Sequence, residues 1–159
     1  MLALAVVPAL AEDLPVAVQA VLLKKTFLFD PLLGGKATVL VVFADDSQEQ
    51  PAQRLATAFR DAEVPADAVR SDAAGERVAG VGAVYFLGPS VDDRLRGLCA
   101  EHHRLSVAGT VALAEGGRVA IAVGVSSAGS PEIVVHRGRL AEEGHRLEPR
   151  LLKLARLVG

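Results

Sequence analysis

Two unbroken runs of apolar residues stand out along the chain and predict strands that are buried on both faces. The first covers residues 37–44 (ATVLVVFA) and the second covers residues 83–87 (AVYFL). Strands with one solvated side alternate apolar and polar residues, whereas strands of a parallel sheet covered by helices on both sides read as continuous apolar runs. Shorter stretches at residues 64–70 and 105–108 are expected to add two further strands. The pattern therefore favours a parallel sheet.

Segments with helical periodicity alternate with these strands. We expect helices over residues 15–28, 48–62 and 90–103, the second preceded by Ser47 and the third beginning at Ser90, both at the spacing of a helix cap. The predicted buried stripe of the first helix consists of Val18, Val21, Leu22 and Leu28. Alternation of strand and helix implies right-handed crossovers between parallel strands.

The last third of the chain departs from this alternation. Residues 118–125 and 131–136 are expected to form a β-hairpin. A short helix over residues 139–143 would end at Gly144, and a second helix is expected over residues 148–158. The apolar face of that last helix would carry Leu147, Leu151, Leu154, Ala155 and Val158. We predict one α/β domain with a mixed, mainly parallel sheet of five or six strands, flanked by helices and completed by the hairpin and the closing helices.

The first eleven residues have the features of a secretory signal peptide. Residues 2–10 form an apolar run, and residues 9–11 (ALA) have the small-x-small pattern of a cleavage site. An apolar N-terminal helix that belongs to the fold is the alternative, but Pro8 would interrupt it. We therefore expect a periplasmic protein with a signal peptide at residues 1–11 and a domain at residues 12–159.

Composition narrows the class of protein. Hydrophobic residues make up 51% of the chain, which is enough for a sizeable core, and the net charge of −2 offers no global attraction to nucleic acid or to an anionic membrane. Cys99 is the single cysteine, so an intramolecular disulfide is impossible. We expect Cys99 to be a small buried residue on a helix, with an intermolecular disulfide or a reactive thiol as the alternative.

Polar residues after the predicted strands are the candidates for a ligand site. They are Asp45 and Asp46 after the first buried strand, Gly88 and Ser90 after the second, and Thr110 after a later one. Open α/β sheets bind ligands at the carboxyl edge of their strands. Acidic pairs occur there in response-regulator receivers, but glycine and proline follow the second buried strand, where a receiver has its phospho-accepting aspartate. The pattern therefore argues against a receiver, and a ligand crevice at this edge of the sheet is kept as an alternative.

Motifs of catalysis and of metal binding are absent from the sequence. It contains no G-x-x-x-x-G-K-[ST] loop, no G-x-S-x-G elbow, no H-E-x-x-H and no C-x-x-C. His102 and His103 lie at a predicted helix end, and His136 and His145 have no partner at ligand spacing. We therefore expect a non-enzymatic protein without metal or cofactor, and an enzyme with an unrecognised site in the strand-end crevice is the alternative.

The predicted last helix carries a basic face. It consists of Arg146, Arg150, Lys153 and Arg156. Such a cluster is usually a solvated helix face, and the alternative is a docking surface for an acidic partner.

The C-terminal stretch carries the most specific signal in the sequence. Residues 135–158 read VHRGRLAEEGHRLEPRLLKLARLV, with Gly144 after one short helix and a Leu-Leu-x-Leu-Ala pattern at residues 151–155. This stretch resembles the end of the YfiR/HmsC-like periplasmic proteins, and the order of signal peptide, first helix, strands and hairpin agrees with that family. The sequence departs from the family where His136 replaces the usual Asn, where residues 29–31 (FDP) replace an aromatic-Pro signature, and in lacking the disulfide-forming cysteines of some relatives.

The resemblance implies a periplasmic regulatory protein. Type members of that family restrain a membrane-bound diguanylate cyclase by contacting its periplasmic domain, which lowers cyclic di-GMP and biofilm formation. We therefore expect a membrane signalling protein, either a cyclase or a sensor kinase, as the partner, and a homodimer as one expected assembly. The alternative is a periplasmic protein that binds a small molecule in the strand-end crevice, because fold alone does not decide function.

Overall fold

The structure is a computed structural model that describes residues 13–159. The signal peptide expected at residues 1–11 lies outside the described residues. Within the described part of the chain, no helix is long and apolar enough to cross a membrane.

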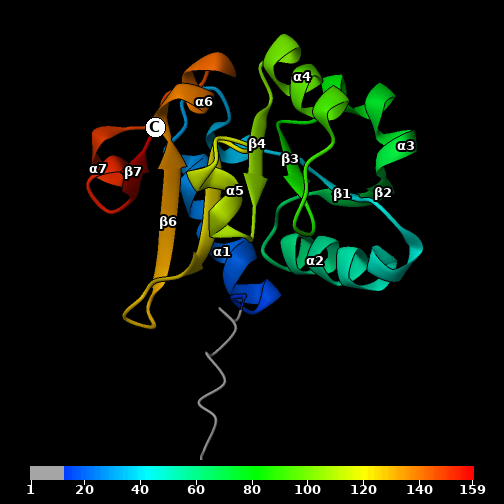
Figure 1. The fold of residues 1–159 in the computed structure, drawn as a ribbon, viewed down its shortest axis with the longest axis horizontal. Helices are drawn as coiled ribbons and strands as arrows, with labels where there is room; N and C mark the ends of the chain where they lie inside the picture. Colours follow the sequence, from blue (N-terminus) through cyan, green and yellow to red (C-terminus); the bar gives the residue numbers. More distant parts are fainter. Residues whose placement is uncertain (1–12) are drawn as a thin grey trace, which may run out of the picture.

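A seven-stranded sheet in the order β2-β1-β3-β4-β5-β6-β7 forms the centre of the domain (Figure 1). The strands are β1 (Val39–Phe43), β2 (Ala66–Arg70), β3 (Ala83–Phe86), β4 (Leu105–Ala108), β5 (Ile121–Val125), β6 (Pro131–His136) and β7 (Arg156–Val158). Strands β1 to β5 are parallel, β6 runs antiparallel to β5, and β7 is parallel to β6. The expected α/β class with a mixed, mainly parallel sheet is confirmed, and the sheet exceeds the expected five or six strands because the C-terminal segment adds β7.

Helices cover both faces of this sheet. They are α1 (Val16–Leu28), α2 (Glu49–Asp61), α3 (Ser71–Ala74), α4 (Asp93–His102), α5 (Val111–Glu115), α6 (Arg137–Glu142) and α7 (Pro149–Leu152). The α1 and α2 helices share one core with buried residues of α6 and α7, whereas α3, α4 and α5 share the core on the other face. The sequence pattern did not predict α5.

The first buried strand shows how the apolar runs build these two cores. Val39, Val41 and Phe43 of β1 pack into the core beneath α1 and α2. Leu40 and Val42 point the other way, into the core beneath α3, α4 and α5. Because each such side chain stabilises the fold by about 1.5–3 kcal/mol when it leaves water, a strand that is apolar throughout belongs between two helical layers.

The prediction of a helix over residues 148–158 is wrong. The chain forms a single turn, α7, and then pairs as β7 with β6. Leu151 in the turn is buried, while Leu154, on the predicted apolar face, is 79% exposed. Without β7, strand β6 would present backbone N–H and C=O groups along an open edge, and pairing satisfies them. Hydrogen bonding at the sheet edge therefore outweighs the helical periodicity of this segment.

Two predicted helix caps are also wrong, because aspartates take the place of the serines. The Ser47 N–H donates to Asp45 Oδ1 at 3.0 Å, in a 3-10 turn that precedes α2. The Leu95 N–H donates to Asp92 Oδ1 at 3.0 Å, so Asp92 and not Ser90 caps α4. A carboxylate is the stronger acceptor for the free N–H groups of a first helical turn.

Candidate functional site

The strand order places a topological switch point between β1 and β3. The chain leaves β1 toward α2 on one face and leaves β3 toward α4 on the other, so the two loops separate at the carboxyl edge of the sheet. Open α/β sheets bind ligands at such points. A crevice of about 180 Å³ lies here, lined by Val42, Phe43, Ala44, Ser71, Phe86, Leu87, Ser90, Val91 and Asp92.

The carboxylates of Asp45 and Asp46 are engaged within the protein and are not part of this lining. Asp45 accepts hydrogen bonds from the backbone N–H and the hydroxyl of Ser47. Asp46 forms an ion pair with Arg70 at the end of β2. Among residues 13–159, no group of three or more His, Cys, Asp or Glu side chains lies close enough together to hold a metal ion.

Gly88 and Ser90 both lie in the loop between β3 and α4, but only Ser90 is in the lining of the crevice. Gly88 has a φ of +95°, and a Cβ there would lie 2.6 Å from Nε2 of Gln48. Oε1 of Gln48 accepts a hydrogen bond from the Ala44 N–H at 2.9 Å, so this side chain bridges the ends of β1 and β3. Ser90 is exposed and lines the crevice. Of the five predicted ligand residues, the structure brings Ser90 alone into the described lining.

Two buried polar side chains, Tyr85 and Gln19, form a hydrogen-bonded pair beside Gly109, which follows β4. The Tyr85 hydroxyl donates to Oε1 of Gln19 at 2.6 Å, and Nε2 of Gln19 donates to the Leu14 carbonyl at 2.8 Å. Burial raises the pKa of Tyr85, so its hydroxyl stays protonated. A Cβ at Gly109 would lie 2.2 Å from the Tyr85 oxygen, so only glycine permits this close approach. Thr110 follows at the start of α5, outside the lining of the crevice.

Helix α1 exposes apolar side chains, so its predicted buried stripe is wrong at Val21 and Leu28, whereas Val18 and Leu22 are partly buried against the core. Val21 is 53% exposed, Leu28 is 52% exposed and Val16 is 38% exposed. The buried residues of this helix are Gln19, Ala20, Leu23, Thr26 and Phe27. Apolar residues occur all round α1, so helical periodicity alone did not reveal which side faces the sheet. Val16, Val21 and Leu28 are named here the outer face of α1.

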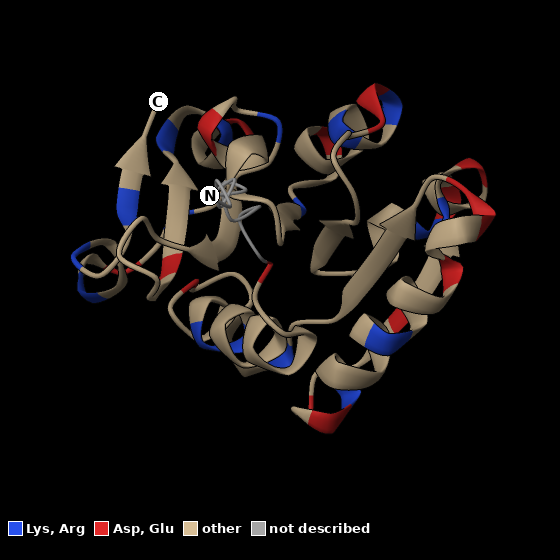
Figure 2. Cartoon of the chain, turned by 60° about the horizontal axis from the view of Figure 1, so that its bottom comes forward, with Lys and Arg blue, Asp and Glu red and all other residues tan. Residues whose placement is uncertain are grey.

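A groove of about 540 Å³ lies between α2 and the part of α1 that carries Val16 and Val21, and Leu28 lies outside it. It is lined by Val16, Ala17 and Val21 on α1 and by Gln53, Arg54, Thr57, Ala58, Asp61 and Ala62 on α2. The charged residues of α1 are two lysines, Lys24 and Lys25, whereas α2 carries both acidic and basic residues (Figure 2). One wall of the groove is therefore apolar and the other is largely polar. The helical pattern did not reveal this groove, because Val21 was expected in the core.

The four basic residues predicted to share a helical face do not share one. Arg146 precedes α7, Arg150 lies in α7, Lys153 follows it, and Arg156 lies in β7. The Arg156 guanidinium pairs with the carboxylates of Glu115 and Glu132, at 3.2 Å in each case. The change from helix to strand after α7 therefore separates Arg156 from the other three.

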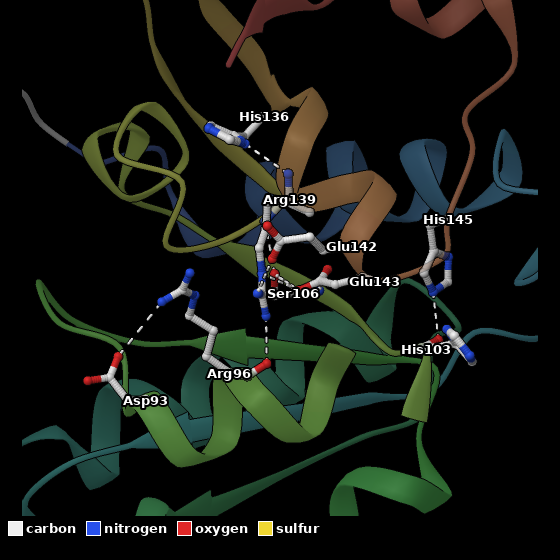
Figure 3. A network of polar contacts seen from close by, with 10 residues as sticks. Asp93, Arg96, His103, Ser106, His136, Arg139, Glu142, Glu143 and His145 are labelled. Carbon is white, nitrogen blue, oxygen red and sulfur yellow. Dashed lines mark hydrogen bonds and ion pairs between the residues drawn. The ribbon is translucent and has the colours of Figure 1, made fainter. Parts of the chain in front are cut away.

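A buried ionic network joins α6 to β4 and α4 (Figure 3). Nε of Arg139 donates to Oε2 of Glu143 at 2.9 Å, and these side chains are 4% and 0% exposed. Glu143 also accepts hydrogen bonds from the Ser106 N–H at 2.8 Å and from the Ser106 hydroxyl at 2.6 Å. Nη2 of Arg139 donates to the Arg96 carbonyl at 2.5 Å. The helical spacing of Arg139 and Glu143 could have signalled their pairing, but Ser106 lies 37 residues away in sequence.

Two groups with nucleophilic chemistry, Cys99 and Ser106, are closed off from solvent. Cys99 is fully buried on α4, as predicted, and burial raises the pKa of its thiol to about 12. The Ser106 side chain is fully buried and bound to Glu143. A nucleophile has to reach its substrate, so these two groups serve the fold in this state.

A second buried ionic contact fixes the end of α1 to the C-terminal segment. Nδ1 of His145 lies 2.5 Å from Oδ2 of Asp30, and both side chains are almost fully buried. Nε2 of His145 lies 2.7 Å from the His103 carbonyl oxygen. Burial lowers the pKa of His145, but the hydrogen bond and the charge of Asp30 outweigh burial and hold it above the ordinary value of 6.5.

No family model and no curated protein matches this chain. Its fold does match solved structures. An ABC domain in complex with L-Trp, from Streptococcus pneumonia, superposes with a TM-score of 0.64 at 13% identity over 91% of this chain. A conserved domain protein from Vibrio cholerae has the same TM-score at 10% identity, also over 91% of this chain. This chain spans 60% of the length of each of these proteins, and at such identities the likeness shows a shared α/β fold alone.

Proposed function

We propose that the chain is a non-enzymatic binding protein that restrains a membrane-bound signalling enzyme, such as a diguanylate cyclase, by contacting the periplasmic domain of that enzyme. The outer face of α1 carries this proposal. Val21 and Leu28 each expose about half of their surface on a helix that is already apolar on its inner side. Large apolar side chains left exposed on one helix favour an interaction site there, because a partner that covers them removes their surface from water.

The groove beside the outer face of α1 adds shape and charge to this docking surface. Its volume of about 540 Å³ is large enough to accept protruding side chains of a partner. Arg54 and Asp61 on the opposite wall offer one charge of each sign. In protein interfaces such charges fix register and orientation more than they add affinity. The surface therefore suits a specific protein partner.

The C-terminal sequence supports the same proposal from a separate direction. Residues 135–158 resemble the end of the YfiR/HmsC-like proteins, whose type members act on membrane cyclases. The apolar run and cleavage pattern of residues 1–11 support export to the periplasm, where the protein could contact the periplasmic domain of a membrane enzyme. The engaged carboxylates of Asp45 and Asp46 support a role without catalysis.

The test is capture of the partner by residues 12–159 carrying an affinity tag, from the solubilised envelope of the source bacterium. We expect a membrane cyclase or sensor kinase to be recovered by the unchanged protein. Val21→Glu and Leu28→Glu should each reduce that recovery at least about tenfold, because a carboxylate would be buried against an apolar partner surface.

Leu154→Glu is the matched control for this experiment. Leu154 is 79% exposed and lies outside the α1 groove, so the same chemical change should leave recovery unaltered. Equal recovery by the α1 variants and by Leu154→Glu would contradict the role of the outer face. Recovery of no membrane signalling protein by any of them would contradict the function itself.

One observation favours a second candidate, a periplasmic small-molecule binding protein. The switch-point crevice occupies the usual ligand position of open α/β sheets, and one protein of similar fold is in complex with L-Trp. The crevice volume of about 180 Å³ is below the roughly 300–1,000 Å³ of most ligand pockets, which favours the first proposal. Calorimetric titration with the common amino acids decides between the two candidates. Heat of binding that is measured with the unchanged protein and is lost in the variant Ser90→Phe would support the second candidate.

A further inference from the structure

A second groove lies where the turn after α1 meets the loop before α7. It has a volume of about 400 Å³, and its apolar lining includes Pro31 and Leu32 on one side and Leu147 and Pro149 on the other. Leu147 is buried, whereas Leu32 is 65% exposed. Arg146 also lines the groove and is exposed. The lining also includes Glu148, whose carboxylate is paired with Arg150. The C-terminal groove, as it is named here, therefore has an apolar interior and a rim where the charge of Arg146 is not balanced by a neighbouring carboxylate.

The two sides of the C-terminal groove are fixed to each other beneath it. The buried contact between His145 and Asp30 joins them, and the Glu148 N–H donates to the Phe29 carbonyl at 2.9 Å. The Leu32 N–H donates to the second oxygen of Asp30 at 2.9 Å, which holds the turn that presents Leu32. Such a groove is formed before anything binds, so an occupant does not have to supply the free energy of ordering it.

The positive charge beside the C-terminal groove is available to a partner. Within residues 13–159, Arg146 makes no hydrogen bond or ion pair with another side chain. Arg150 is 81% exposed, and the single carboxylate near it, that of Glu148, lies 3.4 Å away. Nη2 of Arg150 donates a long hydrogen bond to this carboxylate. The Arg150 guanidinium also lies 5.6 Å from the centre of the Phe29 ring, a stacking that orients the group while its other N–H donors face solvent.

We propose that the C-terminal groove binds an acidic peptide segment of another protein. An apolar side chain of that segment lies between Leu32 and Leu147, and neighbouring carboxylates face Arg146 and Arg150. Guanidinium groups match carboxylates in a bidentate geometry, which favours an acidic occupant over a neutral one. The concave shape favours a protruding side chain over the flat surface of a bilayer. This inference does not depend on the proposed function, because the outer face of α1 plays no part in it.

Selection from a phage-displayed library of random dodecapeptides tests the proposal. Residues 12–159 are immobilised, and phage that also bind the double variant Arg146→Glu, Arg150→Glu are discarded. We expect the retained peptides to be enriched in Asp and Glu next to Leu, Ile or Phe. Absence of retained peptides, or enrichment of basic or uncharged sequences, would overturn the proposal.

Fluorescence anisotropy with a retained peptide then locates its binding site. Arg146→Glu and Arg150→Glu should each weaken binding about fivefold, as expected for loss of an exposed ion pair, and added salt should weaken it further. Leu32→Ser should weaken binding without a salt effect of its own. Lys25→Glu, an exposed reversal on α1, is the matched control and should leave binding unchanged. Weakening by Lys25→Glu equal to that by Arg146→Glu would reject the groove as the site.

Discussion

Helices α1 and α2 lie side by side on the same face of the sheet, yet they expose different kinds of side chains to solvent. Each has 13 residues and each buries a phenylalanine almost completely, Phe27 in α1 and Phe59 in α2. The exposed side of α2 carries charged residues such as Arg54 and Asp61, whereas α1 exposes Val21 and Leu28. A polar outer side is well solvated and needs no partner. An apolar outer side, in contrast, indicates a surface that another molecule covers.

The largest expected effect tests whether the inner sides of these helices are equivalent. Phe27→Ala and Phe59→Ala should each lower the free energy of unfolding by about 3–5 kcal/mol, because each leaves a cavity in the same core. Urea denaturation of the two variants measures this. A much smaller loss for Phe27→Ala would mean that α1 is held loosely against the sheet, and the contrast between the helices would then lie in packing and not in their outer sides.

An intermediate effect concerns the ionic contact that fixes the end of α1. The folded-state pKa of His145 is raised, so its contribution to stability is present in full below about pH 6.5 and is lost as the pH rises through the raised value. Asp30→Asn should lower the free energy of unfolding by about 1–3 kcal/mol at pH 6 and should remove most of this pH dependence. Thermal unfolding across the pH range is the measurement.

Asp61→Asn provides the matched comparison at the end of α2. Asp61 is exposed, so its replacement should leave both the stability and the pH profile nearly unchanged. If Asp30→Asn kept the pH profile of the unchanged protein, the contact between Asp30 and His145 would not be the source of that dependence.

The smallest expected effect on stability concerns the outer sides themselves. The double variant Val21→Gln, Leu28→Gln should change the free energy of unfolding by no more than about 0.5 kcal/mol, because both positions are about half exposed. Its retention on a hydrophobic-interaction column should nevertheless fall. Gln53→Leu, which gives α2 one exposed leucine, should increase retention instead. Equal retention of all three proteins would remove the distinction between the two outer sides.

Strands were more predictable from the sequence than the side of a helix that faces the core. The runs at residues 37–44 and 83–87 contain β1 and β3. A strand that is apolar on both sides belongs in the interior of an α/β sheet, where helices cover both faces. In α2 the polar outer residues identified Leu55 and Phe59 as buried. In α1 the polar residues Gln19 and Thr26 are buried while Lys25 is exposed, so polarity along the helix did not identify the side that faces the sheet.

The strand-end residues illustrate a different limit of sequence reasoning. Asp45 and Asp46 do follow β1, as the pattern predicted, but their partners decide what they do. One partner, Arg70, lies 24 residues away from Asp46 and becomes its neighbour only because β2 pairs with β1. The contact between His145 and Asp30 spans 115 residues. Long-range pairs of this kind follow from the assembled sheet and not from local spacing.

The burial of Cys99 has a practical consequence for mapping these surfaces. Its thiol is buried in the core on the inner side of α4, so maleimide reagents have no accessible target there in the folded protein. A cysteine introduced at position 21 or at position 146, each in the lining of one groove, would then be the single site of modification, and no background substitution of Cys99 would be needed. Fluorophores, spin labels or photocrosslinkers attached at either position can report separately on occupancy of the two grooves.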